Sequence, residues 1–206
     1  MKFNKIQRKI MKRKFSLVGL IMMSTVALLT ANAVSAKESF TIKNGELQRP
    51  TGYREWIQVG TPLTPNDMND GKANFPEFHN VYIDPESWDH WKKTGKFREG
   101  TVFVKEMISV GSKSAASGNG YFMGEFIGLE VAIKSKAAFP NEPGNWAYFS
   151  FSSPDHKTIK ETAQAFPVAD CNSCHEKSAK DDFVFTQYYP VLRAAKNDPI
   201  KAIGGK

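Results

Sequence analysis

Three strand-like stretches, joined by glycine-bearing segments, constrain the fold of this chain more than any other feature. The residues TVFVKEMISV (101–110) alternate in side-chain character, and YFMGEFIGLEVAIK (121–134) and NWAYFSFS (145–152) continue the pattern. The loop GSKSAASGNG (111–120) separates the first two. Consecutive strands joined in this way pair as antiparallel hairpins. The sequence therefore predicts an α+β fold: a mainly antiparallel sheet with a few helices.

One helix is clearly marked before these strands. In DPESWDHWKKTG (84–95), Asp84 has the position of an N-cap, Pro85 follows at the first helical position, and Gly95 ends the pattern. HNVYI (79–83), just before it, is typical of a short strand. Other segments are less sharply marked: 53–60 (helix or strand), 61–78 (a long loop), 159–170 (helical), and helical turns around Pro190.

The first 36 residues have the pattern of a secretory signal peptide. Seven Lys and Arg side chains and no acidic ones precede the apolar run FSLVGLIMMSTVALLT, and Val34 and Ala36 are the small residues before the expected cleavage. The alternative is an uncleaved membrane anchor, for which this run is short. We therefore expect residues 1–36 to be removed and residues 37–206 to form one domain in the periplasm.

Removal of this segment changes the charge of the chain. The full sequence has 28 basic and 21 acidic residues; without the seven basic residues of the leader, 21 of each remain. A formal net charge of zero gives no support for a nucleic-acid partner or an anionic membrane surface.

The chemistry-bearing motif is CNSCH at 171–175, which contains both cysteines of the chain. A redox dithiol normally follows a buried strand, and AFPVAD before this motif is not one. A structural zinc site needs four ligands, and the other two would have to come from scattered histidines. Covalent haem attachment uses both thiols as thioethers and the adjacent histidine as an iron ligand. The motif favours this third chemistry, with Cys171 and Cys174 attaching haem c and His175 binding its iron.

The second axial position decides what a haem does. No methionine follows Met123, although an upstream methionine or one of His79, His90 and His156 could still serve. The simplest interpretation is a five-coordinate haem with one open face. Open haem iron binds or transforms a small ligand.

At this point the sequence resembles the cytochrome P460 family of ammonia-oxidising bacteria, a family whose wider membership includes cytochrome c′-beta. The resemblance covers nearly all of residues 50–196. It rests on these segments: YREWIQVGTPLTPN, VYIDPESWDHWKKTGKFREGTVFVKE, SGNGYFMG, GNWAYFSF and CNSCHEKSAKDDFVFTQYYPVLRAAK.

The resemblance implies an activity and partners that composition does not show. The family oxidises hydroxylamine at a ferric haem, to nitrite or, through bound nitric oxide, to nitrous oxide, as part of nitrification. It implies a homodimer, a periplasmic c-type cytochrome as electron acceptor, and no stable membrane insertion. It also implies that a lysine of the VKE strand motif, here Lys105, is cross-linked to a meso carbon of the porphyrin.

Two residues on the strands are the expected catalytic groups. Alternation places Lys105 on the same face as Phe103 and Met107. From the residues alone, a lysine whose ammonium extends from a sheet edge to water is favoured over a reactive amine; the resemblance reverses this preference. Glu130 is expected to share a face with Gly124, Phe126 and Gly128. It is either a base that takes protons from the substrate or an exposed glutamate, and the resemblance favours the base.

Phe75 and Phe78, in the long loop, are expected to wall the distal side of the haem, although aromatic residues there are more often core.

Three functions are compatible with the motif and the candidate site residues. The leading one is a hydroxylamine oxidoreductase, the second a cytochrome c′-beta-like nitric oxide binding protein without turnover, and the third a plain electron-transfer cytochrome. The lack of a downstream methionine counts against the third.

Overall fold

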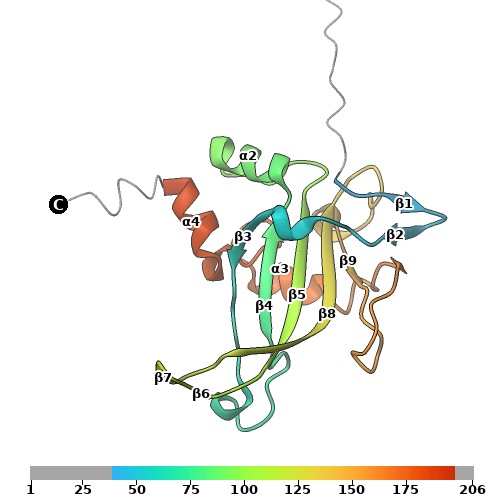
Figure 1. Ribbon diagram of the computed structural model, residues 1–206. Coiled ribbons are helices and arrows are strands. Elements are labelled where there is room, and N and C mark those ends of the chain that lie inside the picture. The colour runs from blue at the N-terminus through green and yellow to red at the C-terminus, as the bar shows by residue number, and fades with distance from the viewer. Residues whose placement is uncertain (1–38, 198–206) are drawn as a thin grey trace, which may run out of the picture. The chain divides into compact units, whose positions relative to one another are not determined.

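The centre of the protein is a five-stranded antiparallel sheet with strand order β3-β4-β5-β8-β9 (Figure 1). The computed structural model describes residues 39–197, so the predicted signal peptide lies outside the described residues. The α+β fold with a mainly antiparallel sheet is confirmed. The strands of the central sheet are β3 (Ile57–Gly60), β4 (Phe78–Ile83), β5 (Val102–Val110), β8 (Met123–Lys134) and β9 (Trp146–Ser150).

Smaller elements surround this sheet. The short strands are β1 (Ile42–Lys43), β2 (Glu46–Gln48) and β10 (Thr162–Ala163), which form a three-stranded sheet, and β6 (Ser114–Ala115) and β7 (Gly118–Asn119), which form a hairpin. The helices are α2 (Pro85–Thr94), α3 (Asn172–Ser178) and α4 (Pro190–Asn197), with 3₁₀ turns η1 (Tyr53–Glu55), η2 (Asn66–Met68), η3 (Pro143–Asn145) and η4 (Thr186–Tyr188). The open segment 53–60 is thus a 3₁₀ turn followed by a strand. Within residues 39–197, none of the helices combines the length and apolar character needed to cross a bilayer.

Helix α2 begins and ends where its sequence predicts. The Asp84 side chain accepts a hydrogen bond from the Ser87 amide at 3.0 Å, and Gly95 ends the helix with φ 65°. Trp91, which is buried, donates from Nε1 to the Leu192 carbonyl at 2.9 Å. This bond ties α2 to α4, and the two helices lie next to each other at one end of the sheet (Figure 1).

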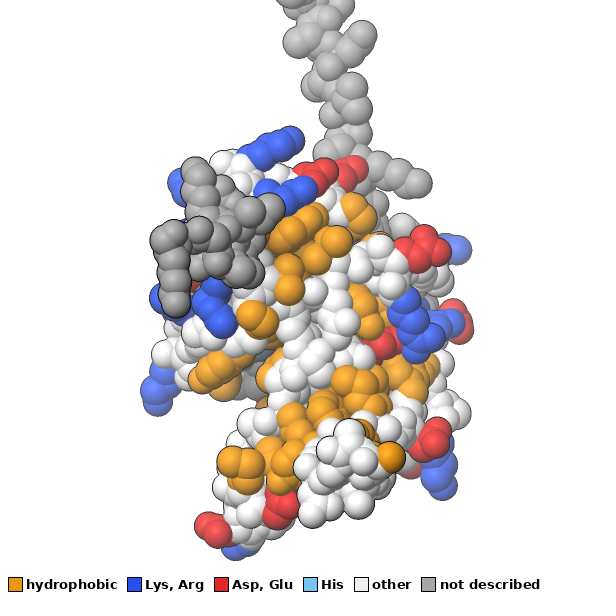
Figure 2. All heavy atoms as spheres, turned by 60° about the vertical axis from the view of Figure 1, so that its left-hand side comes forward, with side chains coloured by type: hydrophobic (Ala, Val, Ile, Leu, Met, Phe, Trp, Pro, Cys, Tyr) orange, Lys and Arg blue, Asp and Glu red, His pale blue; other side chains and the backbone are white. Residues whose placement is uncertain are grey.

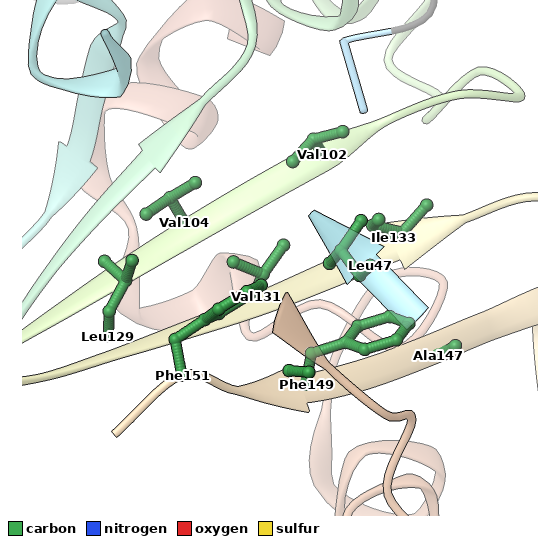
Figure 3. Packing of buried hydrophobic residues seen from close by; sticks show 10 residues of the cluster. Leu47, Val102, Val104, Leu129, Val131, Ile133, Ala147, Phe149 and Phe151 are labelled. Atoms are coloured by element: carbon green, nitrogen blue, oxygen red, sulfur yellow. The ribbon is translucent and has the colours of Figure 1, made fainter. Parts of the chain in front are cut away.

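The two faces of the central sheet are covered by different segments. On what we call the β2 face, Val104 and Val131 pack with Leu47 of β2 (Figure 3). On the opposite, α4 face, Phe103 and its neighbours pack with Leu192 of α4. Because side chains alternate along a strand, each strand contributes to both cores.

A β-bulge in β8 reverses this alternation at one point. Phe126, instead of Ile127, lies opposite Ile108, so Ile127 is an extra residue between regular pairs. The Phe126 ring therefore lies on the β2 face, 5.2 Å from the guanidinium carbon of Arg54. The prediction that Phe126 shares the face of Glu130 is wrong for this reason.

The helix predicted over 159–170 is also not formed. Residues Thr162 and Ala163 pair with β2, and the Phe166 amide donates to the Tyr148 carbonyl of β9 at 2.8 Å. The backbone hydrogen bonds that a helix would make internally go instead to two neighbouring strands. Tertiary pairing therefore overrides the local pattern here.

Candidate haem site

Lys105 and Glu130 face each other across the β5–β8 ladder. They are register partners, and their side chains form an ion pair with 2.5 Å between Nζ and Oε2. Alternation places both on the α4 face, as predicted for Lys105. Their side chains are 24% and 30% exposed, so neither extends freely into water. The structure thus gives Lys105 a partner inside the protein rather than at a sheet edge.

The CNSCH motif forms the start of α3, and its His175 lines the same cavity as this pair. Cys171 is the N-cap residue, and Cys174 lies one turn later, so both thiols lie on one side of the helix. Both are free; Cys171 is half-buried and Cys174 exposed. Burial, with a smaller contribution from the Glu130 carboxylate, raises the pKa of the Cys171 thiol to about 11. The buried Asn172 side chain donates to the Trp146 carbonyl at 2.8 Å and anchors the helix to β9.

His175 is held in one orientation. Its Nδ1 is 2.7 Å from the Phe183 carbonyl, an acceptor, which assigns the proton to Nδ1 and leaves the lone pair on Nε2. Its ring lies between those of Tyr148 and Phe185, with centroids 4.4 and 4.7 Å away. Burial lowers the pKa of this imidazole, while the hydrogen bond to Phe183 acts in the opposite direction. A neutral, oriented imidazole with a free Nε2 is the form that binds iron.

The turn that carries Phe183 has an unusual backbone. Asp182 and Phe183 have φ values of 44° and 63°, in the region that side chains rarely adopt. Lys134 stabilises this conformation, since its Nζ contacts the Asp182 carboxylate at 3.0 Å and the Gly144 carbonyl at 2.9 Å. Strained backbone of this kind is retained where the surrounding structure over-determines it, and here it aims the Phe183 carbonyl at His175.

Lys105, Glu130 and His175 line a cavity that adjoins a larger groove. A cavity of about 80 Å³ contains Lys105, Glu130 and His175, with aromatic walls that include Tyr148 and Phe185. A groove of about 1040 Å³ adjoins it and shares Glu130 and Phe166. The groove is of the size that accommodates cofactors and other small molecules. Two thiols, an oriented imidazole and aromatic walls in one place are the donor set that a covalently attached haem requires, so the residues fit the group.

Of the two aromatic residues expected to wall the site, only Phe75 lies there. The Phe75 ring lies 5.3 Å from Lys105 Nζ and lines the groove, so Phe75 lies at the site. Phe78 is the buried first residue of β4, opposite Ile108, and lies on the β2 face. The expectation that Phe78 walls the site is therefore corrected: it belongs to a strand, and the alternation of that strand turns its side chain away.

A second carboxylate on β5 lies behind the site. Glu106, next to Lys105, faces the β2 core, with a side chain only 4% exposed. It accepts hydrogen bonds from Tyr53 Oη at 2.6 Å and Arg54 Nε at 2.5 Å. Burial and the bond to Glu106 raise the pKa of the Tyr53 hydroxyl. Alternation thus assigns the two charged residues of the VKE motif to opposite faces and different roles.

Sequence reasoning missed several residues that line these hollows. Tyr148 lies on the β9 strand two residues after Trp146, so the alternation of that strand could have placed it on the α4 face. Phe183 and Phe185 have no such signal, because a turn with positive φ places them. Glu77, which lines the groove beside Phe75, is brought to the site only by the pairing of β4 with β5.

Comparison with known proteins adds one finding to this geometry. The family model described as Cytochrome P460 matches residues 50–186, which include Lys105, Glu130 and the whole CNSCH motif. No curated protein matches the chain significantly.

Proposed function

Because this chain belongs to the cytochrome P460 family of haem proteins, we propose that it is a periplasmic mono-haem c-type enzyme that oxidises hydroxylamine. The observation that carries the proposal is the meeting of Lys105, Glu130 and the Nε2 side of His175 around one cavity. A plain electron carrier has no need of a lysine–carboxylate pair beside its haem.

In this proposal three residues hold the haem. Cys171 and Cys174 form thioethers with its vinyl groups, and His175 binds the iron through Nε2, with Phe183 fixing the ring. The haem supplies an iron that exchanges electrons with a small nitrogen compound. The aromatic rings around His175 limit the access of water to that side of the cavity.

Lys105 is proposed to be cross-linked to the porphyrin. Its Nζ lies in the cavity that contains His175, and it is held there by Glu130 at 2.5 Å. An ion pair in register across two strands restricts the lysine to one region, which is the requirement for a selective covalent reaction. Phe75, at 5.3 Å from Nζ, closes the other side.

Glu130 is proposed as the base that takes protons from the substrate. It lies where the cavity meets the groove, so it faces both the haem site and the space through which a small substrate enters. A positioned general base contributes about a hundred- to ten-thousand-fold in rate. Hydroxylamine loses protons as well as electrons on oxidation, so such a base has a defined task here.

The partners and the location are part of the same proposal. The predicted signal peptide supports export to the periplasm, where a c-type cytochrome would accept the electrons. Large hydrophobic residues with exposed side chains include Met68, Met123 and Phe126, and Figure 2 shows hydrophobic side chains gathered on one face of the molecule. Such a surface supports the proposed homodimer, since exposed apolar patches commonly mark protein interfaces.

The proposal is tested by Glu130→Gln, which keeps the shape of the side chain and removes its basicity. We expect hydroxylamine still to bind, and its oxidation with excess chemical oxidant to slow at least about tenfold in stopped-flow absorption. Glu125→Gln, an exposed glutamate on the same strand, is the matched control and should leave the rate unchanged. Absence of oxidation by wild type, with nitric oxide bound normally, would instead favour the cytochrome c′-beta-like alternative.

A further inference from the structure

A second titratable pair lies beside the site and has no part in the function proposed so far. His79, on β4, is the register partner of Met107, so it shares the α4 face with Lys105. Its Nε2 lies 3.3 Å from Oε1 of Glu77, just before the strand. Both side chains are largely buried, 14% and 13% exposed. A carboxylate and an imidazole kept together away from bulk water form a proton-accepting pair.

The pair is connected to the haem site by contacts on the same face. Glu77 and Glu130 line the same groove of about 1040 Å³. The Phe75 ring contacts both the pair and the site: its centroid is 6.0 Å from the His79 ring and 5.3 Å from Lys105 Nζ. Burial acts to raise the pKa of the Glu77 carboxyl, but the hydrogen bond to His79 and the charges of His79 and Lys105 bring it below its ordinary value. Glu77 therefore lies within electrostatic reach of Lys105.

The chemistry of the site requires a route for protons. Each oxidation of a hydroxylamine-type substrate removes several protons, whereas one carboxylate can hold only one at a time. Glu130 must release each proton before it can accept the next. Polar side chains, among them Ser150, Ser152 and Gln164, form part of the lining of the groove. Waters held by such groups beside a bound haem transfer protons between groups that do not touch.

We propose that Glu77 and His79 are a proton-relay pair that takes protons from Glu130 through water in the groove and releases them to bulk solvent. This inference rests on the proposed function of Glu130 as the base. Only O–H and N–H bonds form and break in this transfer, and no bond between heavy atoms of the protein changes. Each N–H or O–H proton of the substrate goes to Glu130, then to the imidazole of His79, and then to water. The electrons leave separately to the electron acceptor.

Glu77 stabilises the charged imidazole while the proton rests on it, and the hydrogen bond fixes the orientation of the ring. The other charged or titratable groups that line the groove are Glu46, Glu130, His156 and Lys160, with Lys105 on the adjoining strand. Of these, His156 is exposed, and its Nδ1 lies at hydrogen-bond distance, 3.2 Å, from the Ile127 carbonyl oxygen. His156 is therefore the matched control for a histidine that lines the groove without belonging to the pair.

The test uses hydrogen cyanide, which binds ferric haem as the anion and must leave its proton behind without any turnover. Haem-loaded ferric protein is mixed with cyanide in a weakly buffered solution containing a pH indicator. The haem spectrum reports binding, and the indicator reports release of the proton. In wild type we expect the two signals to coincide.

In Glu77→Gln and in His79→Gln, binding should keep its rate while proton release lags by at least about tenfold. Glu130→Gln should slow binding itself, and His156→Gln should change neither signal. Thermal unfolding of each variant checks its fold. If one of the two pair variants is destabilised, the other still tests the relay. Proton release at the wild-type rate in both pair variants overturns the relay, as does the absence of release in wild type. Because hydroxylamine is not used, a failure of the relay is distinguished from a failure of the oxidase proposal.

Discussion

Gly144 is the residue whose replacement tests how the turn at Phe183 is held. Its φ is 61° and its ψ 9°, in the left-handed region that favours glycine. A Cβ at this position would lie 2.5 and 2.6 Å from two ring carbons of Phe183 and 3.2 Å from Cδ1 of Trp146. Gly144→Ala therefore displaces Phe183, whose carbonyl is the acceptor for His175.

Two costs add in this variant. A left-handed backbone costs a residue with a side chain about 1–2 kcal/mol. Forcing a methyl group into a packed site costs about 1–3 kcal/mol. The free energy of unfolding should fall by about 2–5 kcal/mol, which for a domain of this size lowers Tm by about 4–20 °C.

Gly52 provides a matched control. Its φ of 68° and ψ of 6° are nearly those of Gly144, but a Cβ there would meet no atom within 4 Å. Gly52→Ala thus carries only the backbone cost, and the difference between the two variants isolates the contact with Phe183. Thermal unfolding by circular dichroism of wild type and both variants, all loaded with haem, measures this difference.

A second readout follows the consequence at His175. If Phe183 moves, its carbonyl no longer fixes the imidazole, and the iron–histidine stretching band of the ferrous protein should shift in Gly144→Ala but not in Gly52→Ala. Equal Tm values for the two variants would refute the argument that Phe183 is packed against Gly144.

Three further predictions concern the cofactor and the sheet. Replacing both Cys171 and Cys174 by Ala should abolish covalent haem, measured by intact mass after denaturation; retained covalent haem would contradict the attachment. Lys105→Leu should leave haem bound through the thioethers alone, with the spectrum of an ordinary five-coordinate c-type haem, whereas an unmodified Lys105 peptide in full yield from wild type would exclude the cross-link. Glu106→Ala should lower the free energy of unfolding by about 1.5–3 kcal/mol in urea titration, because it removes a buried carboxylate that accepts from Tyr53 and Arg54, while the Arg54 side chain, 64% exposed, stays hydrated. Tyr53→Phe, which removes one hydrogen bond to that charge, should cost about 1.5–3 kcal/mol, and no loss in either variant would show that the cluster adds nothing to stability.

Local sequence signals were sufficient for the elements and for the face of Lys105. The capping of α2 was predictable because Asp84, Pro85 and Gly95 act within one helical turn of their own positions. The face of Lys105 was predictable because β5 is regular up to Met107 and alternation needs no knowledge of neighbouring strands. The α+β class followed from the order of such segments along the chain.

The same reasoning failed where pairing with a neighbouring strand inserted an extra residue into the alternation, or supplied the backbone hydrogen bonds that a helix would have made. Ile127 has no partner residue on β5 and forms a bulge in β8. This bulge turns the Phe126 side chain to the other face. Phe78 is predicted as part of a loop because the strand pattern begins at His79, but its pairing with Ile108 extends β4 by one residue. The segment around Ala163 has helical texture, but β2 offers its backbone better partners than the next turn of a helix would.

The sequence by itself therefore determined the chemistry of the motif, two thiols and a histidine within five residues, because that spacing is local. Only the tertiary structure decided what faces it. Lys105 and Glu130 are 25 residues apart and meet through strand register at 2.5 Å. His175 is oriented by a carbonyl on a turn with positive φ, and the pairing of β4 with β5 brings Glu77, with its partner His79, to the groove that Glu130 also lines. These contacts depend on register, bulges and turns that no single segment encodes, since each is fixed by the segment that packs against it.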